Sequence, residues 1–111
     1  MALYIMLSTL SETGRKVVRK LPGSIRKVNE EVGRMGVKVV AQYAVLGPYD
    51  FVTVIEAPDN ETVAKVSMEL GARGSVQMMT MAAIPVDTFI RRLAGRPAAN
   101  GRGGPRRKRS A

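Results

Sequence analysis

The sequence contains no cysteine and no histidine. Without cysteine, the chain has no disulfide, no thiolate nucleophile and no zinc site of the cysteine type. Without histidine, it lacks the side chain that most often serves as a general base near neutral pH. Metal-ligand spacing, a P-loop and a dinucleotide fingerprint are also missing, so we predict no metal site and no cofactor. Together these absences favour a protein that is not an enzyme.

Long apolar runs are also missing. The apolar stretch at residues 2–7 is too short for a secretory signal and has no basic flank before it. No run approaches the roughly 20 apolar residues of a membrane span. We therefore expect a soluble, cytoplasmic protein without a membrane partner.

Acidic residues are absent from residues 95–111, which hold two thirds of the net charge of +9. Gly, Pro, Ala, Asn and Arg dominate this segment, and it has too few apolar residues to offset the entropy of ordering it. We predict one folded domain over residues 1–94 and a disordered basic tail over residues 95–111. Clustered cations of the tail are candidates for contacts with nucleic-acid phosphates: Arg102, Arg106, Arg107, Lys108 and Arg109.

The first 94 residues alternate between strand-like and helical apolar patterns. Short runs rich in Val, Ile, Tyr, Phe and Thr are typical of strands, and apolar residues three and four apart are typical of helices. Pro22 and Gly23 interrupt the first helix without changing its phase, which predicts a bent helix or two abutting helices on one surface. The predicted strands are 3–8, 37–46, 51–56 and a run within 74–84; the predicted helices are 12–35, 60–70 and 86–93, the last with Phe89, Ile90 and Leu93 inward.

The element order β-α-β-β-α-β predicts an α+β, ferredoxin-like sandwich, in which a four-stranded antiparallel sheet carries both helices on one face. The other face would be polar if it met water. Neither alternating set of strand residues is polar, and apolar patches of that size are rare on monomers. We therefore expect a homodimer that packs the open sheet faces together. One set holds Leu3, Ile5, Val52 and Val54; the other holds Met6, Val40, Leu46, Phe51, Ile55, Met79 and Met81.

The turn between the two central strands carries a family motif. Residues 46–52 read Leu-Gly-Pro-Tyr-Asp-Phe-Val, and residues 54–59 read Val-Ile-Glu-Ala-Pro-Asp. With Ser11-Glu12-Thr13-Gly14, Leu21-Pro22, Gly71, Gly74 and Thr80 in the same order, residues 3–90 resemble the GYD-domain family. The resemblance implies a ferredoxin-like fold of the dimeric α/β-barrel kind and implies no established activity. The basic tail is not part of the family pattern.

Five residues are candidates for a ligand site: Tyr4, Gln42, Gly47, Tyr49 and Asp50. Tyr49 and Asp50 either line a pocket at the edge of the sheet or shape the turn, in which Gly47 takes a positive φ and Asp50 accepts a backbone N–H. Other polar side chains are expected to line a cavity between the sheet and its partner copy, and four methionines are expected to cluster in the core or interface. The polar set is Tyr4, Gln42, Thr53, Gln77 and Thr80, and the methionines are Met6, Met78, Met79 and Met81.

Three functions stay open. The first is a non-catalytic homo-oligomer that binds a small ligand or a regulatory partner in the dimer cavity. The second is a nucleic-acid-associated protein that uses the basic tail; the outer cations of the first helix, between Arg15 and Lys27, are either a solvated face or a phosphate-binding stripe. The third is a cofactor-free enzyme resembling small monooxygenases of the dimeric α/β-barrel kind, which without histidine needs Tyr, Asp or Glu chemistry. We predict the first.

Overall fold

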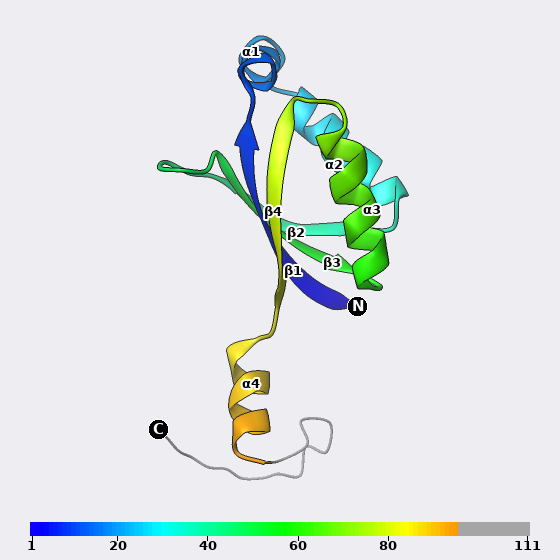
Figure 1. The fold of residues 1–111 in the computed structure, drawn as a ribbon, viewed down its shortest axis with the longest axis vertical. Helices are drawn as coiled ribbons and strands as arrows, with labels where there is room; N and C mark the ends of the chain where they lie inside the picture. Colours follow the sequence, from blue (N-terminus) through cyan, green and yellow to red (C-terminus); the bar gives the residue numbers. More distant parts are fainter. Residues whose placement is uncertain (96–111) are drawn as a thin grey trace.

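A computed structural model describes residues 1–95 and folds them into a ferredoxin-like α+β sandwich. Its four strands form one antiparallel sheet in the order β2-β3-β1-β4 (Figure 1). The predicted fold class is confirmed, and the tail cations from Arg102 onward lie outside the described residues. The elements are β1 (Ala2–Leu10), α1 (Glu12–Lys20), α2 (Ser24–Arg34), β2 (Lys38–Ala44), β3 (Phe51–Ala57), α3 (Asn60–Gly71), β4 (Val76–Ala83) and α4 (Val86–Leu93).

The core lies between the sheet and the helices α2 and α3. Side chains of β1 alternate between buried and half-buried positions, so one face of the sheet is covered and the other is open. The apolar stripe predicted for the helix 60–70 is buried on α3 and confirms that helix. Buried apolar residues of the core are Tyr4, Met6, Val32, Val37, Ile55, Ala57, Val63, Val66 and Leu70.

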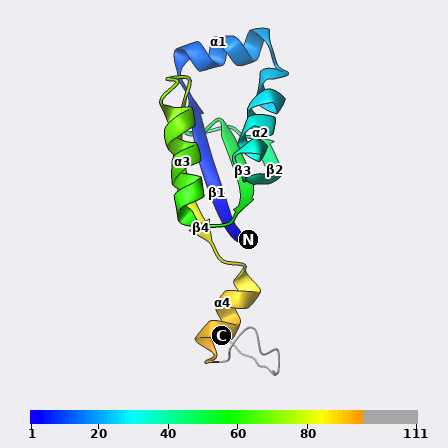
Figure 2. The ribbon, with the colours of Figure 1, turned by 90° about the vertical axis from the view of Figure 1, so that its right-hand side faces the viewer.

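The break at Pro22 and Gly23 produces two helices with different directions. In Figure 2, α1 lies across one end of the sandwich, whereas α2 runs along the face of the sheet. The sequence predicted a bent helix or two abutting helices on one surface, and the structure has two abutting helices. Val18 of α1 faces the same interior space as Val28 of α2, but only α2 runs along the sheet. The stripe is in phase along the sequence, yet Leu21 ends α1 at the corner and is exposed. The change of axis explains this, because phase predicts a common face only along a continuous helix.

The strand register corrects the predicted grouping of apolar residues. Met79 lies opposite Leu7 and Met81 lies opposite Ile5, so both methionines point to the open face. Met78 lies opposite Ser8, on the covered face that also holds Met6. The predicted single methionine cluster is therefore wrong, because the sheet separates its members into two pairs.

A β-bulge in β2 changes which of its side chains share a face. Val39 lies opposite Ile55 on the covered face, whereas Ala41, two residues later, lies opposite Val54 on the open face. The register shift between Val39 and Ala41 accounts for this, because one extra residue reverses the alternation. As a result Gln42 joins Val39 on the covered face, although strict alternation places these residues on opposite faces.

The last described helix, α4, projects away from the sandwich (Figure 1). The helix was predicted at 86–93 and is found at Val86–Leu93. The predicted inward direction of its apolar residues is wrong within residues 1–95, because Phe89, Ile90 and Leu93 are all exposed. Their spacing follows the helical period but nothing in the described part of the chain covers them.

Candidate functional site

A cavity of about 230 Å³ lies between the covered face of the sheet and the helices. All four strands contribute to its floor, α2 forms most of its wall with Leu70 of α3, and residues of α1 close one end. Figure 2 shows α1 lying across this end of the sandwich. Apolar side chains dominate the lining, as is typical of pockets for small molecules. The lining residues used below are Met6, Ser8, Gly14, Val28, Asn29, Gln42, Thr53, Arg73 and Met78.

A chain of polar side chains crosses one side of this cavity. The Nδ2 atom of Asn29 on α2 donates to Oε1 of Gln42 at 2.8 Å, and Nε2 of Gln42 donates to Oγ1 of Thr53 at 3.0 Å. Thr53 is only 6% exposed and Ser8, on the neighbouring strand β1, is 8% exposed. Buried polar groups of this kind need hydrogen-bond partners, so the chain fixes how Gln42 and Thr53 face the cavity.

Arg73 joins the loop after α3 to α2 at the edge of the cavity. Its guanidinium donates through both terminal nitrogens to the carboxylate of Glu31, with an Nη1–Oε1 distance of 2.8 Å. This hydrogen bond lowers the pKa of Glu31 and raises the pKa of Arg73 from their ordinary values. Both side chains are partly exposed, so solvent screens the pair and it adds little stability. The ion pair instead has a structural role. It occupies the guanidinium of Arg73 and holds α2 near the end of α3.

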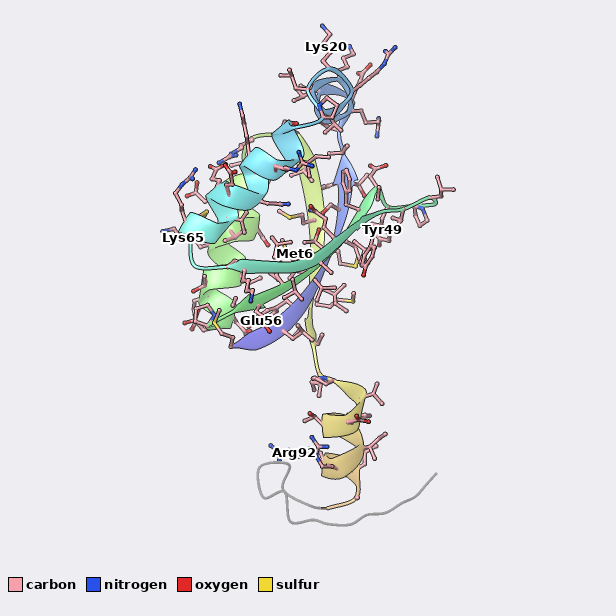
Figure 3. All side chains as sticks on the ribbon, turned by 180° about the vertical axis from the view of Figure 1, so that it is seen from behind. Met6, Lys20, Tyr49, Glu56, Lys65 and Arg92 are labelled. Carbon is pink, nitrogen blue, oxygen red and sulfur yellow. The ribbon has the colours of Figure 1, made fainter. Side chains whose placement is uncertain are left out.

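The hairpin residues singled out by the sequence lie away from this cavity. Oδ2 of Asp50 accepts the backbone N–H of Leu10 at 2.8 Å, and the backbone N–H of Asp50 donates to the carbonyl oxygen of Ser8 at 2.8 Å. Gly47 has a φ of 111°, which favours glycine. Tyr49, labelled in Figure 3, lies in the hairpin, and its hydroxyl contacts Sδ of Met79 at 3.8 Å. Asp50 thus fastens the turn to the end of β1.

Tyr4 and Gln42 have different surroundings. The Tyr4 hydroxyl donates to Oδ1 of Asn60 at 2.5 Å, which ties the beginning of β1 to the first turn of α3. Of the five candidate residues, only Gln42 lines the cavity; the ligand-binding role of the other four stays a prediction. This cavity lies within one chain, whereas the sequence predicted one between two copies. Arg73 and Asn29 were missed, because neither stands in a motif that marks it in the sequence.

We expect Asp50→Ala to lower the free energy of unfolding by about 1–3 kcal/mol, because the N–H of Leu10 loses its carboxylate acceptor. Urea denaturation followed by circular dichroism measures the change. Glu30→Ala, on the exposed side of α2, is the matched control and should unfold like the parent chain. A variant of Asp50 as stable as the parent would contradict the fastening role.

No helix within residues 1–95 is both long and apolar enough to cross a membrane. No cluster of at least three acidic side chains there is arranged to hold a metal ion, and the sequence has no histidine or cysteine to add to one.

Comparison with known proteins places this chain among small α+β domains. The model of the GYD domain matches residues 4–93. A protein of Thermus thermophilus named glutamine synthetase and cystathionine beta-lyase binding protein is 54% identical over 94 residues, which cover 84% of this chain and 99% of that protein.

Solved structures show the same fold at lower identity. The crystal structure of TTHA0845 from Thermus thermophilus has a TM-score of 0.51 and 20% identity, covering 77% of this chain and 95% of that one. The crystal structure of FFRP-DM1 has a TM-score of 0.51 and 23% identity, covering 76% of this chain and 100% of that one. At these identities the structures support the fold alone.

Proposed function

Because the chain belongs to the GYD domain family and shares half its sequence with an enzyme-binding relative, we propose that it is a non-catalytic, regulatory protein that binds other enzymes. The observation that carries the proposal is 54% identity over 99% of the relative's length. The surface by which that relative binds must lie almost entirely within the matched region. We transfer to this chain the two partners in the relative's name, glutamine synthetase and cystathionine beta-lyase.

In the same proposal, the chain forms a homodimer through the open face of the sheet. Half-buried and exposed apolar side chains meet there in register, and no helix of residues 1–95 covers them, since α2 and α3 both lie on the other side of the sheet (Figure 1). Lys38 lies opposite Glu56 in the outermost row, so the rim carries both charges. A two-fold axis would place each apolar row against its own copy, which suits a self-complementary contact. The apolar side chains are Leu3, Ile5, Leu7, Val52, Val54, Met79 and Met81.

We further propose that α4 contacts the enzyme. Its apolar residues Val86, Phe89, Ile90 and Leu93 follow the i, i+3, i+4, i+7 spacing of a helix that lies in a partner's groove. Phe89 is 49% exposed, and the helix projects from the sandwich (Figure 1). The homodimer would bury the open face of the sheet, which is a different surface from the apolar stripe of α4. The stripe of α4 is therefore left to contact an enzyme.

We expect the full chain to bind purified glutamine synthetase or cystathionine beta-lyase in biolayer interferometry. Phe89→Glu should weaken that binding by at least about thirtyfold, because a central aromatic residue of an interface is commonly worth about 2 kcal/mol or more. The matched control is Arg92→Gln, which changes α4 outside the apolar stripe. Light scattering checks that both variants keep the parent's oligomeric state.

Two outcomes would contradict different parts of this proposal. If the unmodified chain binds neither enzyme, the transfer of partners from the relative is wrong. If Phe89→Glu binds as tightly as Arg92→Gln, the enzyme contacts another surface and only the role of α4 fails.

Other expectations from the sequence are unchanged. The cytoplasmic location is kept as part of the proposal. Nucleic-acid binding stays a prediction, since its residues Arg102, Arg106, Arg107, Lys108 and Arg109 lie outside the described part of the chain. A cofactor-free reaction stays a weaker alternative, because no finding supports it.

A further inference from the structure

We propose that the cavity beneath the helices binds a small, uncharged molecule with a hydrocarbon body and one carbonyl or hydroxyl oxygen. This site goes beyond the enzyme-binding function and does not depend on it. Three properties of the cavity support this: its size, its buried hydroxyl groups, and the pairing of Arg73 in its wall with Glu31.

The size of the cavity limits the ligand. Its volume of about 230 Å³ exceeds the roughly 150 Å³ of an engineered apolar cavity that holds benzene. It is below the roughly 300–1,000 Å³ of pockets for drug-sized molecules. Met6, Val28 and Met78 are among the apolar residues of its lining. A short aliphatic or single-ring molecule fits these limits, and methionines adapt readily to such shapes.

Two buried hydroxyl groups provide the polar end of the site. Thr53 Oγ1 already accepts a hydrogen bond from Gln42, so the proton of its own hydroxyl is left to donate. Within residues 1–95 the hydroxyl of Ser8 makes no hydrogen bond with another side chain. Thr53 lies opposite Met6 and Ser8 lies opposite Phe51, so the two hydroxyls are diagonal neighbours on the covered face. Two adjacent donors call for an acceptor oxygen on the ligand.

The charge of the wall excludes an anionic ligand. Among residues 1–95, Arg73 is the only ionisable side chain that lines the cavity, and it lies at the edge. Both of its terminal nitrogens donate to the carboxylate of Glu31. A carboxylate at the inner end of the cavity, beside Ser8 and Thr53, would be buried without a counter-ion, because the guanidinium of Arg73 is already paired with Glu31, and such burial is strongly unfavourable. The ligand that fits is therefore neutral.

Methionine methyl NMR tests the site in the full chain. With the methyl groups labelled with ¹³C, the chain is titrated with 2-heptanone as the neutral compound and with heptanoate as its charged counterpart. We expect saturable shifts at Met6 and Met78, which line the cavity, and none at Met79 and Met81, which lie on the open face. Heptanoate should bind at least about tenfold more weakly.

Thr53→Val removes the hydroxyl while keeping the shape of the side chain, and it should weaken 2-heptanone binding by up to about tenfold. Thr80→Val is the matched control, because Thr80 lies on the same face opposite Met6 but contacts Ser67 and does not line the cavity. Val28→Phe fills the cavity from α2 and should abolish the shifts. This third variant keeps the test decisive if Thr53→Val does not fold.

Several results would overturn the inference. Equal shifts at all four methionines would indicate surface binding, and no saturable shift would indicate an empty or water-filled space. Equal affinity for 2-heptanone and heptanoate would refute the requirement for a neutral ligand. None of these results affects binding to glutamine synthetase or cystathionine beta-lyase, which is measured separately.

Discussion

Replacing Gly14 by alanine is expected to lower the free energy of unfolding by about 3 kcal/mol. A Cβ atom at this position would lie 2.1 Å from the carbonyl oxygen of Ser75. That oxygen belongs to the backbone, so no side-chain rotation can relieve the clash. It also accepts the N–H of Ser11 at 3.0 Å, so separating the two segments breaks this hydrogen bond as well. The first turn of α1 and the loop before β4 therefore require glycine here.

Urea denaturation measures the change in the free energy of unfolding. Gly33→Ala is the control, because it shows the general effect of replacing a helical glycine by alanine without a clash against another segment. Gly33 lies inside α2, and a Cβ atom there meets nothing within 4 Å. Alanine should stabilise this position by about 0.4–1 kcal/mol, because it restricts the unfolded chain. The explanation fails if Gly14→Ala and Gly33→Ala shift the unfolding midpoint in the same direction.

Local signals in the sequence predicted the starts of α1 and α3 correctly. Ser11 caps α1 by accepting the N–H of Gly14 at 3.1 Å, and Asp59 caps α3 by accepting the N–H of Thr62 at 2.8 Å. The bonds with Thr62 also lower the pKa of Asp59. A cap involves residues only three apart, so its chemistry is written in a short stretch of sequence. The order of strands and helices was predictable for a related reason, because each periodicity is local.

Relations between distant segments were not predictable in the same way. The alternation within β4 was correct, yet it does not say which of its faces joins Ile5 and Leu7 of β1. The bulge between Val39 and Ala41 reversed the phase of β2 without a glycine or proline to mark it. Alternation alone therefore could not decide which apolar set the helices cover.

The same limitation explains the candidate site. Gln42 and Thr53 were expected to line a cavity, and they do, but on the face covered by α2 and α3. Asn29 completes their hydrogen-bond chain from α2, thirteen residues before Gln42. Arg73 and Glu31 pair across forty-two positions. A cavity of this kind depends on the distance between helices, and no local pattern in the sequence encodes that distance.

Replacing Val54 by lysine is expected to convert the proposed homodimer into a monomer and to raise its dissociation constant more than about a hundredfold, since a buried ammonium group without a partner costs at least about 3 kcal/mol. Val54 lies in a central row of the open face, opposite Ile5 on β1 and Ala41 on β2. Every side chain named in that row is apolar. A two-fold axis would also bring the lysines of both copies to the same interface.

Size-exclusion chromatography with light scattering measures the assembly. The parent chain should have twice its mass of 12.0 kDa, and Val54→Lys should have the single mass. Ala64→Lys, on the exposed side of α3, adds the same charge away from the open face and should stay dimeric. A monomeric parent chain, or a dimeric Val54→Lys variant, would show that the open face is not the dimer interface.

The Val54→Lys variant also separates the two possible locations of a small-molecule site. Val54 is half-buried on the open face in a single chain, so the lysine can reach water and the sandwich should still fold. The cavity with Met6 and Met78 lies wholly within one chain, on the covered face. A monomeric variant should therefore give the same 2-heptanone shifts at these methionines as the dimer. Loss of those shifts on dissociation would instead place the ligand between two copies.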